Sequence, residues 1–517
     1  MIRMSFMKKS FPEFTAQRRA LLIVILCLFH LIPVWGFKFI PTHDGLSHLY
    51  NAYILTQWNN PKLTKFHEVY ELNLKLPPNW SSHAFFFVML HIFPPLIAEK
   101  IYVTVCVLLF PASLYYFLNA IDQRLHIFGM LGFLYSYNFL LHMGFYNFVL
   151  SAPLCLIGIG YYWKHKSDFQ IKHGAVLNLL LILTYFSHFG SYTLLLFSLS
   201  FLACIYFLDL VETVLDKRHE ASMESSTYMP QSLSKFLYFV GYLTPSYFIL
   251  LNTPLTYSES GKAVYRHFLE LVKYFVNVRS LVYFNDSYLP VSWVFLGLIG
   301  FCAFWTMVER VRRKRMFEVN NAFLLLALIL TVLFFRLPAF YGGSAGWIND
   351  RVHFFIFPIL LGWFIVPEHL WVKRALITTM LLILSWHLSL TIIDYKKLNE
   401  DIREFTSGVH LIEPNSTLSI LNPSDDHSVE WAPYYGLMSG SHYVGNYEPQ
   451  YVVFPLRYKD GNWKFKYAGG AIDYMLAWDV DDPSEQLKEL KEDYQILYQT
   501  KRLKIFQHRW QLRESAS

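Results

Sequence analysis

Cysteine is scarce in this chain and is confined to its apolar stretches. None of the cysteines forms a CxxC pair, and none stands in a Cys/His pattern with the spacing of zinc ligands. Disulfides and structural zinc are therefore not expected. The five cysteines are Cys27, Cys106, Cys155, Cys204 and Cys302.

Charge is also sparse. Charged residues make up 16% of the 517 positions, whereas about a quarter is usual for soluble globular domains. Hydrophobic residues reach 54%, aromatic residues 18%, and the mean hydropathy is +0.30. This composition excludes an ordinary soluble protein. The first apolar run, residues 21–38, has no small-residue cleavage site, so we expect it to stay as a membrane anchor.

Long apolar runs recur through the first three quarters of the chain and predict membrane-spanning helices. The net charge is +6, and the basic residues form short clusters between these runs, which is typical of cytoplasmic loops and not of nucleic-acid binding. All clusters fall on one side of the membrane only if residues 83–97 form a juxtamembrane helix instead of a span. The N-terminus is then cytoplasmic, and eleven spans are predicted at residues 21–38, 101–120, 127–143, 145–163, 174–188, 190–208, 235–252, 288–308, 320–338, 353–367 and 375–393.

After residue 394 the composition changes to that of a soluble domain. We expect a polytopic, mainly α-helical membrane domain over residues 1–394 and a small α/β domain over 395–517. The topology places the first long loop, 39–100, and the C-terminal domain outside the cytoplasm, and predicts a protein of the bacterial cytoplasmic (inner) membrane with a periplasmic C-terminal domain. An amphipathic helix is predicted at 482–494. Strands are predicted at 416–421, 451–458, 473–478, 494–500 and 502–508.

Polar residues gather at the extracytoplasmic ends of the predicted spans. Asp44 and His48 are four residues apart, so they share a face if this stretch is helical. Ordinary explanations exist, because Asp44 could be a helix N-cap, and Lys100 and Arg351 could reach for lipid headgroups. A functional site is favoured because a topology fixed by the basic clusters alone places all these side chains in one layer. The candidate site residues are Asp44, His48, His83, Lys100, His142, Asn147, His188 and Arg351.

This layout resembles the GT-C superfamily of integral membrane glycosyltransferases, which take sugars from polyprenyl-phosphate carriers. The matching features are a first loop opening with an acidic residue ("PTHDGLSHLYNA"), a juxtamembrane helix, a basic residue at the second span ("AEKI") and a soluble C-terminal domain. The resemblance implies that Asp44 is a catalytic base or metal ligand and that Lys100 meets the lipid phosphate. The paired first-loop acids and the "HPPL" motif of the protein-mannosyltransferase type are absent.

The residues themselves fit such a reaction. No GxGxxG loop follows a predicted strand, which argues against a nucleotide-sugar donor. A phosphate leaving group requires cations, for which Lys100 and Arg351 are the candidates. The acceptor hydroxyl requires a base, for which Asp44 is the candidate, with His48 as an orienting group or substitute. Direct displacement would invert the anomeric centre.

The remaining polar residues are predicted to contact substrate, and the need for a cofactor is open. His83, His142, Asn147 and His188 are the predicted substrate-binding residues. A divalent metal is an alternative in which Asp44 and His48, joined by His83 or His188, supply the ligands, since two histidines and a carboxylate suffice for a site.

The predicted activity is therefore sugar transfer from a polyprenyl-phosphate donor to a glycan, lipid or protein acceptor at the extracytoplasmic face. A transporter or flippase of lipid-linked glycans is one alternative, but it is expected to carry charges at mid-membrane. A non-catalytic scaffold in envelope glycan assembly is another. The loop 253–287 is expected to form an interfacial amphipathic helix, or a flap over the cavity as in relatives of the superfamily, and Glu448 is expected to pack the C-terminal domain against the loops.

Overall fold

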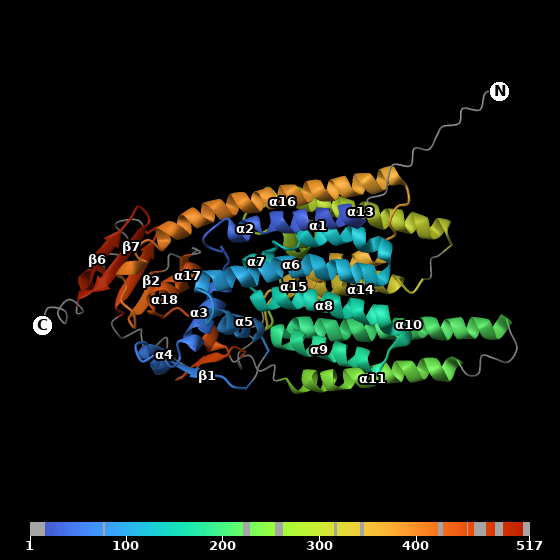
Figure 1. The fold of residues 1–517 in the computed structure, drawn as a ribbon, viewed down its shortest axis with the longest axis horizontal. Coiled ribbons are helices and arrows are strands. Elements are labelled where there is room, and N and C mark those ends of the chain that lie inside the picture. Colours follow the sequence, from blue (N-terminus) through green and yellow to red (C-terminus); the bar gives the residue numbers. More distant parts are fainter. Residues whose placement is uncertain are drawn as a thin grey trace, which may run out of the picture.

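The computed structural model is elongated, with a bundle of helices along its long axis (Figure 1). The first described residues lie near one end of the bundle, and the C-terminal sheet lies at the other. The structure describes residues 16–75, 78–220, 228–253, 262–314, 318–341, 346–421, 428–451, 453–459, 472–480 and 490–509.

The bundle is built from long apolar helices, and the chain is a mainly α-helical polytopic membrane protein. Within the described residues, five stretches are long and apolar enough to cross a membrane: Gln17–Trp35, Pro95–Ile121, Phe189–Glu212, Asp286–Arg312 and Leu370–Leu411. Each of the eleven predicted segments coincides with helical structure. The helices of the bundle are α1 (Ala16–His30), α6 (Pro95–Ile121), α8 (Tyr146–His165), α9 (Ile171–Ser187), α10 (Phe189–Glu220), α11 (Tyr228–Asn252), α13 (Leu289–Arg312), α14 (Asn321–Arg336), α15 (Ile348–Leu360) and α16 (Leu370–Phe405).

The third predicted segment, 127–143, is not one α-helix. It consists of the 3₁₀ helix η1 (Gln123–Phe133) and the short helix α7 (Phe139–His142). Two glycines three residues apart explain the tighter winding, because side chains at this spacing align in a 3₁₀ helix. A Cβ at Gly132 would lie 2.5 Å from Pro111 Cα, and one at Gly129 would lie 3.0 Å from Tyr115 Cα. The glycines therefore let η1 lie directly against the backbone of α6.

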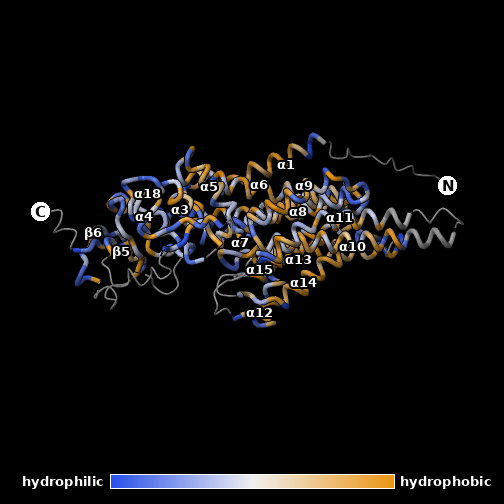
Figure 2. The backbone as a smooth tube through the Cα atoms, turned by 90° about the horizontal axis from the view of Figure 1, so that it is seen from below, coloured by the Kyte–Doolittle hydropathy of each residue, from blue (hydrophilic) through white to orange (hydrophobic). Residues whose placement is uncertain are grey.

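The basic clusters lie at one end of the bundle, as the topology predicts. This is the end where α1 begins, α8 and α13 finish, and α16 starts (Figure 1). Figure 2 shows hydrophobic residues along the bundle and more hydrophilic ones around α4 and α18 at the opposite end.

The first loop forms a compact layer at that opposite end. Its helix α5 (Ser81–Leu90) packs beside α3 and does not run through the bundle, in line with the predicted juxtamembrane helix. The other elements of this layer are α2 (Ile32–Trp35), α3 (Gly45–Thr56), α4 (Thr64–Val69) and β1 (Tyr70–Leu72).

The C-terminal region forms a small α/β unit on this layer. Its five strands lie in the order β3-β2-β5-β7-β6; β2 is parallel to β3 and β5, whereas β7 is antiparallel to β5 and β6. α16 runs through the predicted boundary at 394 and leads into this unit, and most of the predicted helix 482–494 lies outside the described residues. The elements are β2 (Thr417–Leu421), α17 (Ser428–Trp431), α18 (Pro433–Ser439), β3 (His442–Tyr443), β4 (Leu456–Tyr458), β5 (Tyr474–Trp478), β6 (Tyr494–Gln499) and β7 (Leu503–His508).

Two segments from opposite ends of the sequence join here. β1 pairs antiparallel with β4, with Tyr70 opposite Tyr458 and Leu72 opposite Leu456. The first loop and the C-terminal region therefore form one continuous structure over the end of the bundle. The predicted helix in the loop 253–287 is α12 (Phe268–Val276), which buries Leu271 and exposes Phe268 and Leu269.

Candidate active site

A cavity of about 840 Å³ opens between the end of the bundle and the layer formed by the first loop and the C-terminal region. One part of its lining is polar and includes Asp44, His48, Asn147, His188 and Arg351. The other part is apolar and runs between α10 and α14. It is lined by Leu194, Phe197, Leu330 and Leu333. The cavity is therefore amphipathic along its length.

Asp44 stands at the N-terminus of α3, but its carboxylate makes no capping hydrogen bond. Its position is fixed by the backbone, since the N–H groups of His43 and Asp44 donate to the carbonyls of His142 (2.8 Å) and Met143 (3.1 Å). The Tyr447 hydroxyl forms a hydrogen bond with the carboxylate. Asp44 therefore occupies the N-cap position of α3, as one explanation predicted, but its carboxylate does not cap the helix and is available to the cavity.

The surroundings of Asp44 make it a stronger base than an ordinary aspartate. Burial raises the pKa of its carboxyl, and the charge of Glu430 acts in the same direction, whereas the neighbouring His43 opposes the shift. His43 Nδ1 lies 3.1 Å from Glu430 Oε1 and 3.8 Å from Asp44 Oδ1. Burial disfavours the charged imidazole, but these two carboxylates outweigh it and raise the pKa of His43 to about 10. At neutral pH the His43 imidazole is therefore protonated and pairs with these two carboxylates.

Arg351 is the cation of the cavity. It lies in the first turn of α15, and its guanidinium sits 4.6 Å from the ring centroid of Phe145 and 5.9 Å from that of Phe148. These rings are the start of α8, so the charge is held against the cavity wall by cation–π contact. The preceding residue, Asp350, points elsewhere and pairs with Arg266 at 2.6 Å.

Two other predicted residues of the cavity also support local backbone. Asn147 Oδ1 accepts from Ser81 Oγ and from the Ser82 N–H, both at 2.9 Å, and its Nδ2 donates to the Asn79 carbonyl at 3.0 Å. Asn147 thereby holds the start of α5. His188 Nδ1 accepts from the Ser191 N–H at 3.1 Å at the start of α10. Both side chains line the cavity, and the polar atoms named here are engaged within the protein.

Lys100 and His142 do not line this cavity. The Lys100 ammonium donates to the Phe37 carbonyl and lies 5.7 Å from the Trp35 ring centroid. His142 stacks on Tyr283 at 3.9 Å between ring centroids and lines a separate space of about 100 Å³. Both residues lie at the end of the bundle where they were predicted, but their side chains point away from this cavity.

His83 lies behind the cavity wall and not in it. Its Nε2 is 2.8 Å from Glu448 Oε2, and His48 Nδ1 is 2.6 Å from Glu448 Oε1. Two groups of side chains lie close enough to share a metal: His48, His83 and Glu448 form one, and His43, Asp44 and Glu430 form the other. The predicted ligands Asp44 and His48 therefore fall in different groups. Glu448, fully buried, packs the C-terminal region against the first loop, in line with the role expected for it. Glu430 and Tyr447 were not predicted as site residues, and only the unusual polar composition around "GNYEPQ" pointed to this region.

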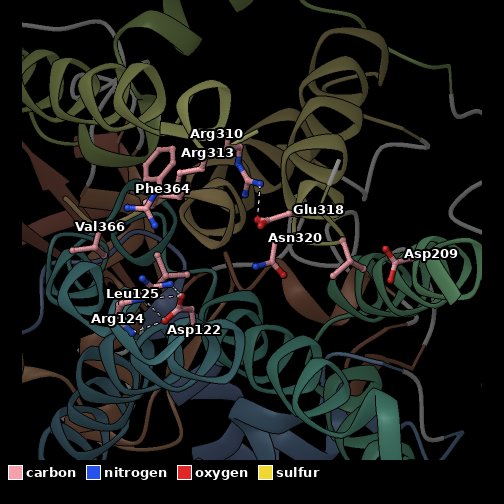
Figure 3. Close-up of a pocket in the computed structure, with 12 residues that line it drawn as sticks. Asp122, Arg124, Leu125, Asp209, Arg310, Arg313, Glu318, Asn320, Phe364 and Val366 are labelled. Atoms are coloured by element: carbon pink, nitrogen blue, oxygen red, sulfur yellow. Dashed lines mark hydrogen bonds and ion pairs between the residues drawn. The ribbon is translucent and has the colours of Figure 1, made fainter. Parts of the chain in front are cut away.

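A second cavity, of about 480 Å³, lies at the opposite end of the bundle (Figure 3). Its charged side chains compensate one another in pairs, with Arg310 2.9 Å from Glu318 and Arg124 2.6 Å from Asp122. The arrangement offers no excess of one charge to a ligand, so it is not a candidate for the active site.

Comparison with known proteins finds similarity to solved structures. No protein-family model matches the chain, and no curated protein matches it. The fold is similar to that of ArnT from Cupriavidus metallidurans, whose crystal structure contains undecaprenyl phosphate, over 95% of this chain and 98% of that chain, with 14% sequence identity and a TM-score of 0.48. The similarity concerns the arrangement of elements, and no residue role is taken from it.

Proposed function

We propose that this chain is a membrane glycosyltransferase of the GT-C type, which moves a sugar from a polyprenyl-phosphate donor to an acceptor at the extracytoplasmic face. The observation that carries the proposal is the division of the 840 Å³ cavity. Its lining combines a carboxylate and a guanidinium with an apolar wall contributed by α10 and α14. The donor has the same division, since its sugar and phosphate are polar and its prenyl tail is apolar.

In the proposed reaction Asp44 removes the proton from the acceptor hydroxyl. The hydroxyl oxygen then forms a bond to the anomeric carbon, while the bond from that carbon to the phosphate oxygen breaks. Polyprenyl phosphate leaves with the electron pair, and the configuration at the anomeric carbon is inverted. The raised pKa of Asp44 suits this role, because a base acts best when its pKa lies near the working pH.

Arg351 is the proposed partner of the leaving phosphate. Its guanidinium can form two parallel hydrogen bonds to phosphate oxygens, and it stands where the polar and apolar parts of the cavity lining meet on α15. Lys100 is no longer assigned this role, because its ammonium donates to the Phe37 carbonyl and does not line the cavity. His48, whose Nδ1 faces Glu448, is assigned to the wall of the site and not to proton transfer.

The proposed setting follows from the same orientation of the chain. The end of the bundle that carries the basic clusters faces the cytoplasm, and the cavity faces outward from the cytoplasmic membrane of a bacterium. The acceptor is a glycan, a lipid or a protein that reaches the cavity from outside. Membrane lipid surrounds the bundle, and nucleic acid is not among the expected partners.

The test is a transfer assay with the purified full-length chain and a panel of polyprenyl-phosphate sugars carrying a labelled sugar. Asp44→Asn should lower turnover by about 10²–10⁴-fold, the usual contribution of a general base. Asp286→Asn is the matched control, because Asp286 is exposed in the 3₁₀ helix before α13 and does not line the cavity. It should retain wild-type turnover.

Two results would refute the proposal. If the wild-type chain transfers sugar from none of the donors but moves a labelled lipid-linked glycan across a vesicle membrane, the chain is a flippase. If Asp44→Asn retains wild-type turnover, the carboxylate is not the base and the reaction needs another mechanism.

A further inference from the structure

A cluster of titratable side chains behind the cavity wall takes no part in the proposed reaction. It consists of His48 from α3, His83 from the first turn of α5 and Glu448 from the C-terminal region, and is termed the triad below. The ligand atoms of the three side chains all lie within 4.8 Å of one another. The exposed fractions are 5% for His48, 1% for His83 and 0% for Glu448. The triad is therefore dry and compact.

The contact between His48 and Glu448 is not an ordinary hydrogen bond. Nδ1 and Oε1 are 2.6 Å apart, yet both are buried atoms without a hydrogen-bond partner, because the angles are unsuitable. In a hydrogen bond the acceptor lies close to the N–H axis. Around a metal ion, the ion occupies the lone-pair axis of the nitrogen and the other ligands lie to its side. A carboxylate oxygen that is close but off the axis is the arrangement of two ligands that share a cation.

The rest of the carboxylate is held from behind. Asn51 Nδ2 donates to Glu448 Oε2 at 2.8 Å, and Asn51 Oδ1 accepts from Asn446 Nδ2 at 2.9 Å. Supporting hydrogen bonds of this kind orient the carboxylates that bind metals. They leave Oε1 directed at His48.

We propose that the triad binds one divalent transition-metal cation of the Zn²⁺ class. Two imidazoles and one carboxylate are a ligand set that suits this ion and leaves a further position for water. Bonds of about 2.0–2.2 Å in tetrahedral geometry place ligand atoms about 3.3–3.6 Å apart, so the facing nitrogen and oxygen atoms, now 2.6 and 2.8 Å apart, must separate by somewhat less than about 1 Å. The three residues come from separate segments of the chain, so each can make such a shift. The cysteine pattern that argued against structural zinc does not bear on a site of histidine and glutamate.

The ion would join the first loop to the C-terminal region. His48 and Phe454 both line the cavity, and the Phe454 ring lies 5.8 Å from that of His48 and 5.6 Å from that of His83. The ion therefore fixes one wall of the cavity and does not touch the reacting atoms. The inference does not depend on the proposed reaction, because metal binding can be measured without a substrate.

The experiment measures metal in the full-length chain purified without chelator. Elemental analysis should give about one mole of divalent transition metal per mole of chain, and a stripped sample should take up one equivalent of Zn²⁺ in equilibrium dialysis. Glu448→Gln and His83→Gln should each weaken Zn²⁺ uptake by at least about 100-fold. Glu413→Gln is the matched control, since this carboxylate is exposed and belongs to neither group of possible metal ligands, and it should bind Zn²⁺ as the wild-type chain does.

Wild-type measurements keep the test decisive if the variants fail to fold. X-ray absorption of the Zn²⁺-loaded wild-type chain should show two imidazole nitrogens and oxygen in the remaining positions. Absence of metal together with absence of Zn²⁺ uptake by the wild-type chain overturns the inference. So does uptake that survives in both folded triad variants, or a spectrum dominated by sulfur. None of these results alters the transfer assay with Asp44→Asn, so the two proposals fail independently.

Discussion

The position of Asp44 depends on a glycine in the turn before α8. Gly144 adopts a φ of +75°, and a Cβ at this position would lie 2.1 Å from the Gly45 nitrogen and 2.5 Å from the Asp44 nitrogen. All of these nearest atoms belong to the backbone and cannot rotate away. Gly144→Ala therefore moves the start of α3, and with it the carboxylate of Asp44, without changing any side chain of the proposed site.

The size of the effect follows from these distances. Ordinary contact begins at 3.4 Å, so the backbone around Asp44 must retreat by about 1 Å. A misplacement of about 1 Å in a catalytic group costs about 10²-fold in rate. The left-handed backbone adds about 1–2 kcal/mol of destabilisation for an alanine. We expect turnover to fall about 100-fold, with a much smaller change in the KM for the donor.

Gly440→Ala separates the effect of displacing Asp44 from the cost of placing alanine in a left-handed backbone conformation. Gly440 ends α18 with a φ of +77°, but the nearest atom to its Cβ would be the Leu63 side chain at 3.2 Å. This variant carries the same backbone cost and should keep near-wild-type turnover. The assay is sugar transfer under saturating donor, with thermal unfolding followed in parallel. Equal losses of turnover in the two variants, or wild-type turnover in Gly144→Ala, would show that the placement of Asp44 does not limit the reaction.

Three further variants address the remaining assignments. Arg351→Gln should raise the KM for the donor by about tenfold or more, because the phosphate loses a charged hydrogen-bond partner. Arg336, exposed at the end of α14, is the control, and Arg336→Gln should leave this KM unchanged. Equal effects of the two variants would show that Arg351 does not bind the phosphate. Lys100→Met should leave that KM unchanged, and a rise as large as that of Arg351→Gln would return Lys100 to the phosphate site. The acid limb of the kcat/KM profile should lie above the usual aspartate range, because burial raises the pKa of Asp44 and activity requires its ionised form. Glu430→Gln removes a negative charge that also raises this pKa, so the limb should move to lower pH; a limb that stays or rises contradicts the assignment.

The fold was predictable because membrane helices obey a length rule that one sequence displays. The apolar runs and the basic clusters between them predict the membrane-spanning segments. Strands such as β2 and β5 are predicted from their short runs of apolar residues. The 3₁₀ winding of η1 was missed, although Gly129 and Gly132 stand at the spacing that permits it. A 3₁₀ helix has three residues per turn and an α-helix has 3.6. Over one short segment the two give nearly the same pattern of apolar residues, so the sequence does not distinguish them without knowledge of the neighbouring helix.

The sequence predicts how far along the bundle the site residues lie, but it does not predict which way their side chains point. Topology fixes how far along the bundle a residue lies, and on that basis Lys100 and Arg351 belong to one layer. The face of the helix is decided by packing, and contacts of α6 with α2 turn Lys100 toward the Phe37 carbonyl. Arg351 instead lies over Phe145 at the start of α8. Two cations at the same depth thus have different surroundings.

The C-terminal contacts could not be derived from the sequence, because each joins residues several hundred positions apart. Tyr447 reaches Asp44, Glu430 reaches His43, and Glu448 lies between His48 and His83. Each pair combines a polar residue of the first loop with a polar residue of the C-terminal region, and no local signal in either segment indicates which residue pairs with which. The same contacts mean that the charge state of Asp44 is set partly by residues of the C-terminal region, so this region belongs to the site and is not an appendage to it.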